Sequence, residues 1–210
     1  MKLKRECMSD RLKQVLLERI LDGTYQPGDR LVELQIAREM ETSQAPVREA
    51  LYELAAMGLV ESEAYRGTRV RQVSAEELQE SYQVRAILEE MAAQLAAPKF
   101  YKNPLPLQTA HAAVQAAAQT GDVDAHAKLD AAFHRLIVET SGNSVLLRVW
   151  DSLSFETWTR INLMLIKSKT VDLQSLIEEH QQIVDAFMLC DGKTAGRLLH
   201  QHLEAAIKIA

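Results

Sequence analysis

The sequence predicts a mainly α-helical chain in two parts, a small N-terminal unit of three helices and a β-hairpin followed by an all-α antiparallel helical bundle. Alanine and leucine are abundant while aromatic residues make up only 5% of the chain, a composition that favours helices. The polar–apolar alternation typical of strands occurs only near residues 59–71. From residue 74 onward, apolar residues recur at helical spacing without a strand pattern. We therefore expect domains at residues 1–73 and 74–210.

Periodicity and capping residues predict two helices at the start of the first part, at about residues 10–21 and 34–40. A tight turn then leads to a third helix. Asp10 or Ser9 can cap the start of the first helix. Leu34 and Ala37 should face inward from the second. Between them, a turn that contains Pro-Gly precedes a very short strand at residues 30–31.

The stretch SQAPVREAL opens a third helix, at about residues 45–57. Ser43 can cap it, and Pro46 falls in its first turn, where a missing N–H costs nothing. The apolar face should be buried, so that Gln44 and Arg48 lie on or near the opposite side. Strands at about residues 59–62 and 68–71 should then form a hairpin. Three helices followed by a hairpin form a winged helix-turn-helix. In this motif the third helix is the recognition helix, which enters a DNA groove.

These segments resemble a known family. YQPGDRLVELQIAREM, SQAPVREALYELAAMGLVE and YRGTRV resemble, over about residues 12–73, the DNA-binding head of the GntR superfamily of bacterial transcription regulators. The resemblance implies that the third helix lies in the major groove and that the wing reaches the minor groove. Matched by position, it implies DNA contacts by Arg38, Arg48 and Gly67.

Around these positions we also expect DNA contacts from Ser43, Gln44, Ala45 and Arg66. Gln44 and Ala45 depart from the family, which more often has arginine and threonine there. Glutamine prefers adenine whereas arginine prefers guanine, so the family's usual operator preference does not carry over. Taken singly, the helix arginines can be solvated charges, and Arg66 with Arg69 can protect an edge strand.

The net negative charge of the chain comes entirely from its second part. Residues 1–73 hold 12 Lys and Arg against 12 Asp and Glu, and residues 74–210 hold 12 against 17, which accounts for the net charge of −5. Any DNA affinity must therefore come from local clustering of arginine.

The composition also favours the cytoplasm. No apolar run approaches the about 18 residues that span a bilayer, so we expect no membrane association. The first ten residues lack the apolar core of a signal peptide. Cys7 and Cys190 form no CxxC pair or disulfide framework, as is typical of a reducing compartment.

The second part should contain about six helices. A long one should run from residue 74 to about residue 97, with Leu78, Tyr82, Arg85, Leu88, Ala92 and Leu95 along one stripe, and should end before Pro98. The others are expected at about residues 107–120, 123–140, 145–167, 173–189 and 194–209, with a kink near residues 157–162 in the third of these five.

Four polar residues occupy positions where the helical stripes should be apolar. Asp130 and His134 are one helical turn apart, and His180 and His202 each fall among aliphatic residues. One carboxylate and three imidazoles that point into a bundle suit a divalent metal, with Zn²⁺ preferred and Ni²⁺ or Mn²⁺ as alternatives. Each can instead be a satisfied core residue. His111, His126 and His200 are set aside, with His126 as the best substitute ligand.

The second part resembles a known domain as well. DAAFHRLIVETSGN, EEHQQIVDAF and AGRLLHQHL resemble, over about residues 74–209, the FCD ligand-binding domain of the FadR-like branch of the GntR superfamily. The resemblance implies that Asp130, His134, His180 and His202 bind a metal at the bottom of an effector pocket. It implies that Arg85, within VRAILEE, meets the carboxylate of the effector. We also expect Trp158 and Arg160 to line the pocket, although Arg85 can instead form an ion pair within the subunit.

Together these patterns predict a cytoplasmic, homodimeric transcription regulator rather than an enzyme. Two heads related by a two-fold axis should read a pseudo-palindrome in double-stranded operator DNA. A small organic acid should bind with the metal and relieve repression. Two alternatives remain, a regulator for which the metal is itself the signal, and a metal-dependent hydrolase. The hydrolase is disfavoured because the chain has no HExxH motif and the DNA head would then be unexplained.

Overall fold

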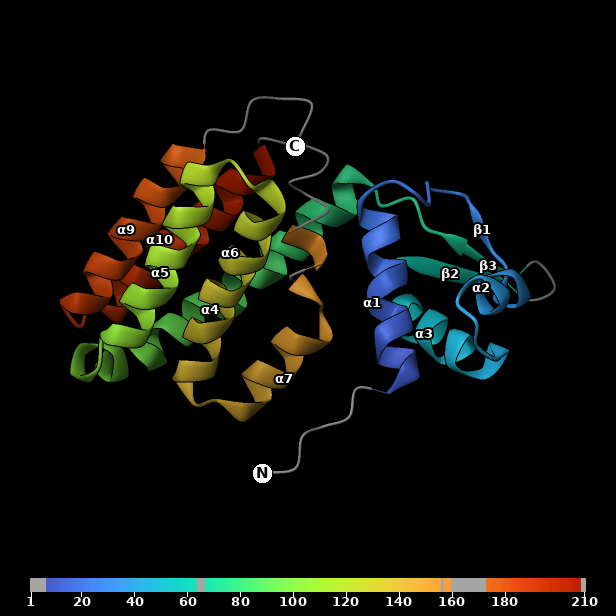
Figure 1. Ribbon diagram of the computed structural model, residues 1–210. Helices are drawn as coiled ribbons and strands as arrows, with labels where there is room; N and C mark the ends of the chain where they lie inside the picture. The colour runs from blue at the N-terminus through green and yellow to red at the C-terminus, as the bar shows by residue number, and fades with distance from the viewer. Residues whose placement is uncertain (1–6, 64–66, 156, 160–172, 209–210) are drawn as a thin grey trace. The chain divides into compact units, whose positions relative to one another are not determined.

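The chain divides into two compact units, Met1–Ser74 and Ala75–Ala210 (Figure 1). The computed structural model describes residues 7–63, 67–155, 157–159 and 173–208. Each unit has its own buried apolar residues and is described separately below. Among the described residues, no helix combines the length and apolar character needed to cross a membrane.

The N-terminal unit is a winged helix-turn-helix, as the sequence predicts. Its elements are α1 Met8–Leu21, β1 Arg30–Leu31, α2 Glu33–Glu39, α3 Gln44–Ala56, β2 Val60–Glu63 and β3 Gly67–Val70. The three strands form an antiparallel sheet in the order β1-β3-β2. Leucines and valines from α1, α3 and the strands fill the core, among them Leu16, Leu31, Val47, Leu54 and Val70.

The starts of the helices differ from the expected caps. The N-cap of α1 is Cys7 rather than Ser9 or Asp10, because Asp10 then stands at the third helical position, where its carboxylate accepts the N–H of Cys7 at 3.3 Å. In α2, Ile36 takes the inward position beside Ala37, so the prediction that Leu34 faces inward is wrong. Ser43 is the N-cap of α3, but its side chain makes no capping hydrogen bond.

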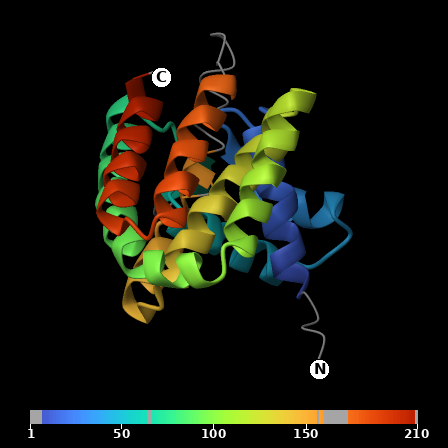
Figure 2. The ribbon, with the colours of Figure 1, turned by 90° about the vertical axis from the view of Figure 1, so that its left-hand side faces the viewer.

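The C-terminal unit is a bundle of helices, which confirms the predicted fold class. Its described helices are α4 Ala75–Lys102, α5 Leu105–Thr120, α6 Val123–Ser141, α7 Ser144–Ser152, α9 Leu173–Met188 and α10 Gly192–Lys208. Figure 2 shows α10 beside α4 on one side of the bundle, with α9, α6 and α5 following across it. One apolar core joins all six.

Two boundaries differ because packing overrides local signals. α4 continues through Pro98 to Lys102, since Phe100 beyond the proline is buried against Phe187 at a centroid distance of 5.1 Å. Its expected stripe shifts, and Leu95 is exposed. The helix expected at 145–167 instead stops at Ser152, where a turn with Ser154 at φ 51° follows. Residues 157–159 are helical again, and the rest of the expected kink lies outside the described residues.

Candidate metal centre and nucleic-acid interface

Three helices bring the four predicted metal ligands together. Asp130 and His134 lie one turn apart on α6, His180 on α9 and His202 on α10, and all four are buried. One ligand atom from each lies within 4.8 Å of all the others. This grouping was expected, although the sequence alone could not place α9 and α10 beside α6.

The spacing of these atoms fits a small divalent ion. Nε2 of His180 is 3.1 Å from Nε2 of His202 and 3.3 Å from Oδ1 of Asp130. Nε2 of His134 is 3.7 Å from Oδ1 of Asp130. Ligands at about 2.0–2.1 Å from a tetrahedral ion are separated by about 3.3 Å. Nε2 of His134 is also buried without a hydrogen-bond partner in the described structure, so the donor set fits a metal better than it fits a self-satisfied polar core.

Two carboxylates orient these imidazoles. Nδ1 of His134 is 2.5 Å from Oε2 of Glu89, and Nδ1 of His202 is 2.6 Å from Oε2 of Glu179. Because a carboxylate only accepts hydrogen bonds, each Nδ1 carries the proton and each Nε2 presents a lone pair toward the other ligands. Carboxylates placed in this way fix the ring and raise its basicity in metal sites.

The sequence reasoning missed both of these carboxylates, of which Glu89 is the fully buried one. Its buried carboxylate also accepts hydrogen bonds from Nε of Arg85 at 2.7 Å and from Nε1 of Trp150 at 3.0 Å. Burial alone would raise the pKa of Glu89, but Arg85 and His134 outweigh it and lower this pKa to about 2. Glu89 is therefore ionised. The only available signal was its place one turn after Arg85 in VRAILEE.

The imidazoles themselves are held in the form that binds metals. Burial lowers the pKa of His134, although the nearby Glu89 opposes it. Burial holds the pKa of His180 well below its ordinary value. Only neutral imidazole binds a metal, so His134 and His180 are in the protonation state that a metal ligand requires.

Arg85 is fully buried rather than on the surface. Beyond its ion pair with Glu89, it donates from Nη1 to Oγ1 of Thr159 at 2.8 Å. Its guanidinium lies over the rings of Tyr82 and Phe155 at 5.6 and 5.8 Å. Nη2 is buried and makes no hydrogen bond within the part of the chain that the structure describes.

A cavity of about 30 Å³ adjoins the metal ligands. Its lining combines Arg85, two of the ligands and an apolar end, and comprises Tyr82, Arg85, His126, Asp130, Thr159, Leu176, His202, Leu203 and Ala206. His126 therefore lines the cavity and is not one of the four clustered ligands. Its Nδ1 is buried without a partner among the described residues. Trp158 borders a separate hollow with Leu153 and Phe155. Arg160 lies outside the described residues.

The other two histidines that the sequence reasoning set aside have different surroundings. His111 on α5 is buried, with its ring 6.4 Å from that of His180. His200 on α10 lies nearer the surface, with Nδ1 2.8 Å from Oε2 of Glu90.

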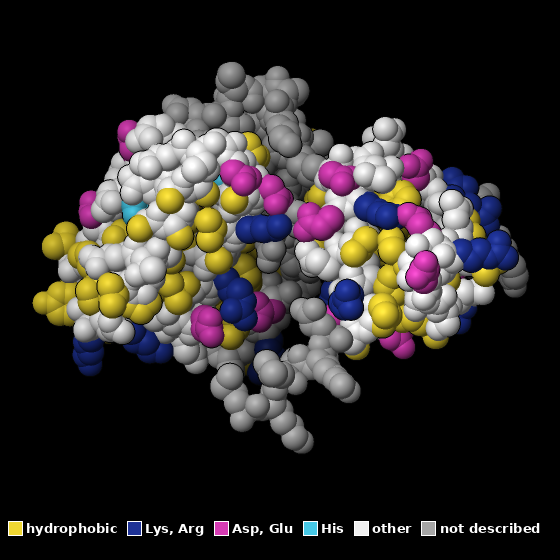
Figure 3. All heavy atoms as spheres, in the orientation of Figure 1, with side chains coloured by type: hydrophobic (Ala, Val, Ile, Leu, Met, Phe, Trp, Pro, Cys, Tyr) yellow, Lys and Arg dark blue, Asp and Glu magenta, His cyan; other side chains and the backbone are white. Residues whose placement is uncertain are grey.

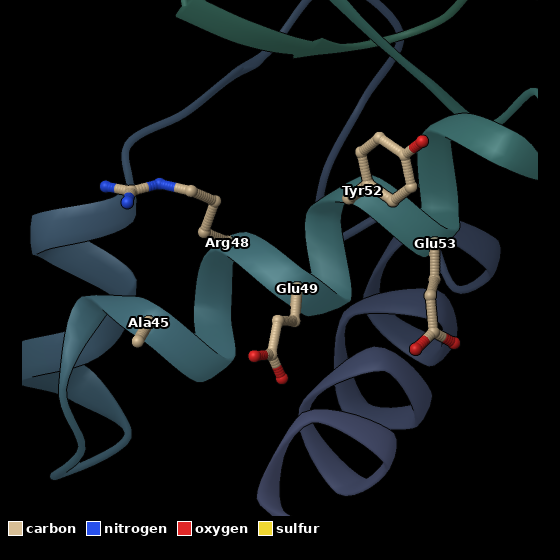
Figure 4. A pocket seen from close by; sticks show the side chains of 5 residues that line it. All are labelled: Ala45, Arg48, Glu49, Tyr52 and Glu53. Atoms are coloured by element: carbon tan, nitrogen blue, oxygen red, sulfur yellow. The ribbon is translucent and has the colours of Figure 1, made fainter.

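In the N-terminal unit, α3 exposes the residues expected to read DNA. Gln44, Ala45 and Arg48 are all exposed. Figure 4 shows Arg48 reaching toward α2, with Tyr52 on the next turn. The Arg48 side chain is 67% exposed and donates from Nε and Nη2 to both carboxylate oxygens of Glu33, at 3.0 and 2.7 Å. Tyr52, 78% exposed, adds an aromatic ring to this surface. Glu49 and Glu53 point to the other side of α3 (Figure 4).

The wing adds further basic side chains. Arg30 on β1 stands opposite Arg69 on β3, which places two like charges side by side. On the other side of Arg69, Glu61 of β2 is its partner in the register, so an acidic residue adjoins this pair. Gly67 adopts φ +85°, and a Cβ there would lie 3.4 Å from the guanidinium of Arg30. Arg38 is exposed on α2, and Arg66 falls outside the described residues. Figure 3 shows Lys and Arg side chains gathered at the right-hand edge of this unit, where Figure 1 has the strands and α2.

Comparisons with known proteins agree with both halves of this description. Residues 8–70 match the family model for bacterial regulatory proteins of the gntR family, and residues 80–205 match that of the FCD domain. The chain is 34% identical over 204 residues to a probable D-xylose utilization operon transcriptional repressor of Paenarthrobacter nicotinovorans, covering 97% of this chain and 89% of that protein. It is 30% identical over 207 residues to the HTH-type transcriptional regulator LutR of Bacillus subtilis, covering 88% and 92%. A solved structure of a GntR transcriptional regulator from Rhodococcus sp. RHA1 has the same fold, with a TM-score of 0.75 at 24% identity over 96% of both chains.

Proposed function

Because this chain belongs to the GntR family of bacterial transcription regulators and carries an FCD domain, we propose that it is an operator-binding repressor released by a small organic acid that binds beside a divalent metal. Its relatives are regulators rather than enzymes, so the hydrolase alternative is discarded. We place it in the cytoplasm, where operator DNA is found. We assign DNA recognition to residues 1–73 and effector binding and dimerisation to residues 74–210.

The observation that carries the effector half of the proposal is the convergence of four buried ligand atoms from three helices. Asp130, His134, His180 and His202 would hold the ion, for which Zn²⁺ suits the N₃O donor set best and Ni²⁺ or Mn²⁺ are alternatives. A bound ion supplies a coordination position for a carboxylate oxygen. Arg85 would meet the same carboxylate through Nη2, the one guanidinium nitrogen placed in the site without a partner among the described residues.

Ligand binding must change the shape of the C-terminal unit. A cavity of about 30 Å³ is roughly the volume of one or two water molecules, far below the about 300 Å³ of ordinary ligand pockets. An organic acid therefore requires α4, α6, α9 or α10 to move apart. A ligand that binds only the expanded form shifts the equilibrium toward it, which is the differential affinity that allosteric control needs.

The DNA half of the proposal rests on exposed groups of α2, α3 and the wing. We propose that Gln44, Ala45 and Arg48 face base edges in the major groove. Ser43 would contact a phosphate at the start of α3, where backbone N–H groups attract anions. We assign backbone or minor-groove contacts to Arg38 and to the wing residues Arg66 and Gly67.

A homodimer would present two such heads to a pseudo-palindrome. We propose that a second copy packs on an outward face of α4, the α4 stripe, formed by Val84, Ile87, Met91 and Leu95. These large aliphatic side chains are exposed and recur at helical spacing. A two-fold interface needs such a self-complementary patch, because each copy contributes the same residues.

An operator-binding titration tests the proposal. Full-length protein is measured by fluorescence anisotropy after chelation, after reloading with Zn²⁺, and with Zn²⁺ plus a panel of organic acids. We expect release from DNA only with both the metal and an acid. Release by the metal alone would instead support a direct metal sensor.

A matched pair of variants locates the effect. His180→Ala should abolish the acid response, whereas His200→Ala, which alters a histidine outside the ligand group, should retain it. An unchanged response in His180→Ala, together with no stoichiometric metal in the wild type, would rule out the metal site.

A further inference from the structure

The outward face of α3 carries a surface hollow, which we call the α3 hollow. It has a volume of about 500 Å³ and is lined by Ala45, Arg48, Glu49, Tyr52 and Glu53, all from this one helix. Figure 4 shows Arg48 and Tyr52 along one side of it and Glu49 and Glu53 along the other. Ala45 leaves the first turn of the helix open, because its side chain is a single methyl group. The α3 hollow therefore lies on the surface that the proposed function assigns to the major groove.

The charges around the α3 hollow favour a neutral group over a phosphate. Arg48 is paired with Glu33, and Glu53 accepts a hydrogen bond from Nζ of Lys13. Glu49 is exposed, and its carboxylate forms no ion pair or hydrogen bond in the part of the chain that the structure describes. A carboxylate without a counter-charge would repel a DNA phosphate at this place. A base edge carries no net charge, so the α3 hollow suits the floor of the groove better than its phosphate rim.

Tyr52 gives the α3 hollow an aromatic wall. The residue is 78% exposed, and its hydroxyl makes no hydrogen bond to any residue that the structure describes. Arg48 stands one turn earlier, so its aliphatic stem and the ring of Tyr52 are about 6 Å apart along the helix axis. Covering this ring with a base edge would remove a large apolar surface from water.

Only one DNA base carries a methyl group in the major groove. Thymine presents its C5-methyl group there, whereas the other bases present hydrogen-bond donors and acceptors. Aromatic rings and alanine methyl groups are typical contacts of that methyl group. A methyl group has no charge, so it can pack against Tyr52 without an unfavourable interaction with Glu49.

We infer that the α3 hollow receives the C5-methyl group of an operator thymine, which packs against the ring of Tyr52 and the stem of Arg48. Tyr52 thereby determines specificity through its ring rather than through its hydroxyl. Gln44 lies two turns earlier on α3, so the two residues read different base pairs. The inference rests on the proposed function, because it names one base of the operator which that function requires.

Replacement of thymine by uracil removes only this methyl group and therefore tests the inference directly. The full chain first enriches a duplex from a pool of random sequences, and each thymine of that duplex is then replaced singly by uracil. Fluorescence anisotropy measures the affinity for each duplex. We expect one replacement in each half-site to weaken binding by about fourfold, the value of one buried methyl group.

Two variants separate the ring from the hydroxyl. Tyr52→Phe keeps the ring and should keep the discrimination between thymine and uracil, whereas Tyr52→Ala should bind the two duplexes about equally well. Tyr101→Ala is the matched control, because Tyr101 is also an exposed tyrosine, 61% accessible, but lies on α4. It should discriminate as the wild type does. The melting temperature of each variant shows that it is folded.

The outcomes separate this inference from the proposed function. A wild type that binds the enriched duplex but tolerates every uracil overturns the inference and leaves operator binding standing. The inference also fails if Tyr52→Ala still discriminates, or if Tyr52→Phe loses as much discrimination as Tyr52→Ala, since the hydroxyl would then make the contact. Failure of the full chain to enrich any duplex overturns both.

Discussion

Arg48 is held in a defined orientation before any DNA is present. Its fork of N–H groups is occupied by the carboxylate of Glu33 on α2, and the side chain remains largely exposed. An exposed ion pair of this kind contributes little to folding. Its consequence is to present the guanidinium at one place on α3, where it would meet DNA with less loss of side-chain entropy if Arg48 contacts the operator as proposed.

We expect Arg48→Ala to weaken operator binding by about 1–3 kcal/mol, the usual cost of removing one specific arginine contact. Fluorescence anisotropy on labelled operator measures it. Arg135→Ala serves as the control, since Arg135 is a comparably paired arginine on α6. Equal operator affinity for wild type and Arg48→Ala would contradict the assigned role.

Gln44 should set the base preference of this regulator. Glutamine pairs with adenine N6 and N7, whereas arginine pairs with guanine O6 and N7. Gln44→Arg should therefore change the preferred base at one operator position from adenine to guanine, by about 1–3 kcal/mol. Binding to operators that differ only at each position measures this. Gln35→Arg adds the same charge to the exposed surface of α2 and should change affinity without changing base preference.

Glu89 should control metal affinity although it is not a ligand. Glu89→Gln weakens the acceptor that orients His134, and such partners typically contribute about 10–100-fold in affinity. Competition with a chromogenic chelator measures the loss. Glu90→Gln alters the next residue, which pairs with His200 near the surface, and should leave zinc affinity unchanged. Equal losses in both variants would show that Glu89 acts only through general stability.

The residues of the site differ in how far sequence can reveal them. Asp130 and His134 are recognisable because one helical turn separates two polar residues on an apolar face. His180 and His202 each stand out as a polar residue among aliphatic ones, but nothing local links them to α6, and the resemblance to a family strengthens that link. Glu89 lies 45 residues before His134, and only the packing of α4 against α6 brings the two together. Local pattern carries no information about such contacts.

At the scale of elements, α4 and α10 show where packing overrides local rules. A proline normally ends a helix, yet α4 runs past Pro98 because Phe100 beyond it is buried in the core. Along α10, two glycines four residues apart face α4. A Cβ on Gly192 would lie 2.9 Å from Cα of Gln94, and a Cβ on Gly196 would lie 2.9 Å from the carbonyl oxygen of Glu90. The two backbones therefore approach closely along this contact.

Gly196→Ala should consequently destabilise the protein by about 1–3 kcal/mol, the cost of overpacking. The sign is informative, because alanine in a helix otherwise stabilises by about 0.5–1 kcal/mol relative to glycine. Urea denaturation of the metal-free protein measures the change. Arg197→Ala, at the exposed neighbouring position, should stay within about 0.5 kcal/mol of wild type. A stabilised Gly196→Ala would mean that the two helices separate without cost.

At the scale of the whole molecule, the residues assigned to DNA recognition and those assigned to effector control lie in different units. α3 and the wing carry the groups that would read DNA, and α4, α6, α9 and α10 enclose the metal ligands and the cavity. The two-part architecture follows from the sequence because hydrophobic periodicity changes at the boundary. The proposed coupling between the units does not follow from the sequence, since it would depend on a second copy of the chain and on an operator that both copies share.

Dimerisation through the α4 stripe gives the last prediction. Ile87 is 64% exposed, so Ile87→Glu should leave the fold of one chain intact while placing a charge in the interface between two. Light scattering should give twice the 23.6 kDa chain mass for wild type and a single chain mass for the variant. The monomer should then lose affinity for the full pseudo-palindrome and bind it no more tightly than a half-site.

Leu189→Glu is the control for that experiment, because Leu189 is an exposed leucine, 78% accessible, that does not belong to the α4 stripe. It should remain dimeric. A dimeric Ile87→Glu would show that the interface lies elsewhere on the chain. A wild type that is monomeric at micromolar concentration would contradict the proposal that two heads related by a two-fold axis bind one pseudo-palindrome. If both variants behave as expected, operator affinity depends on a surface remote in sequence from α3. The effector would then need only to change how two intact heads are spaced, because each head keeps its own core.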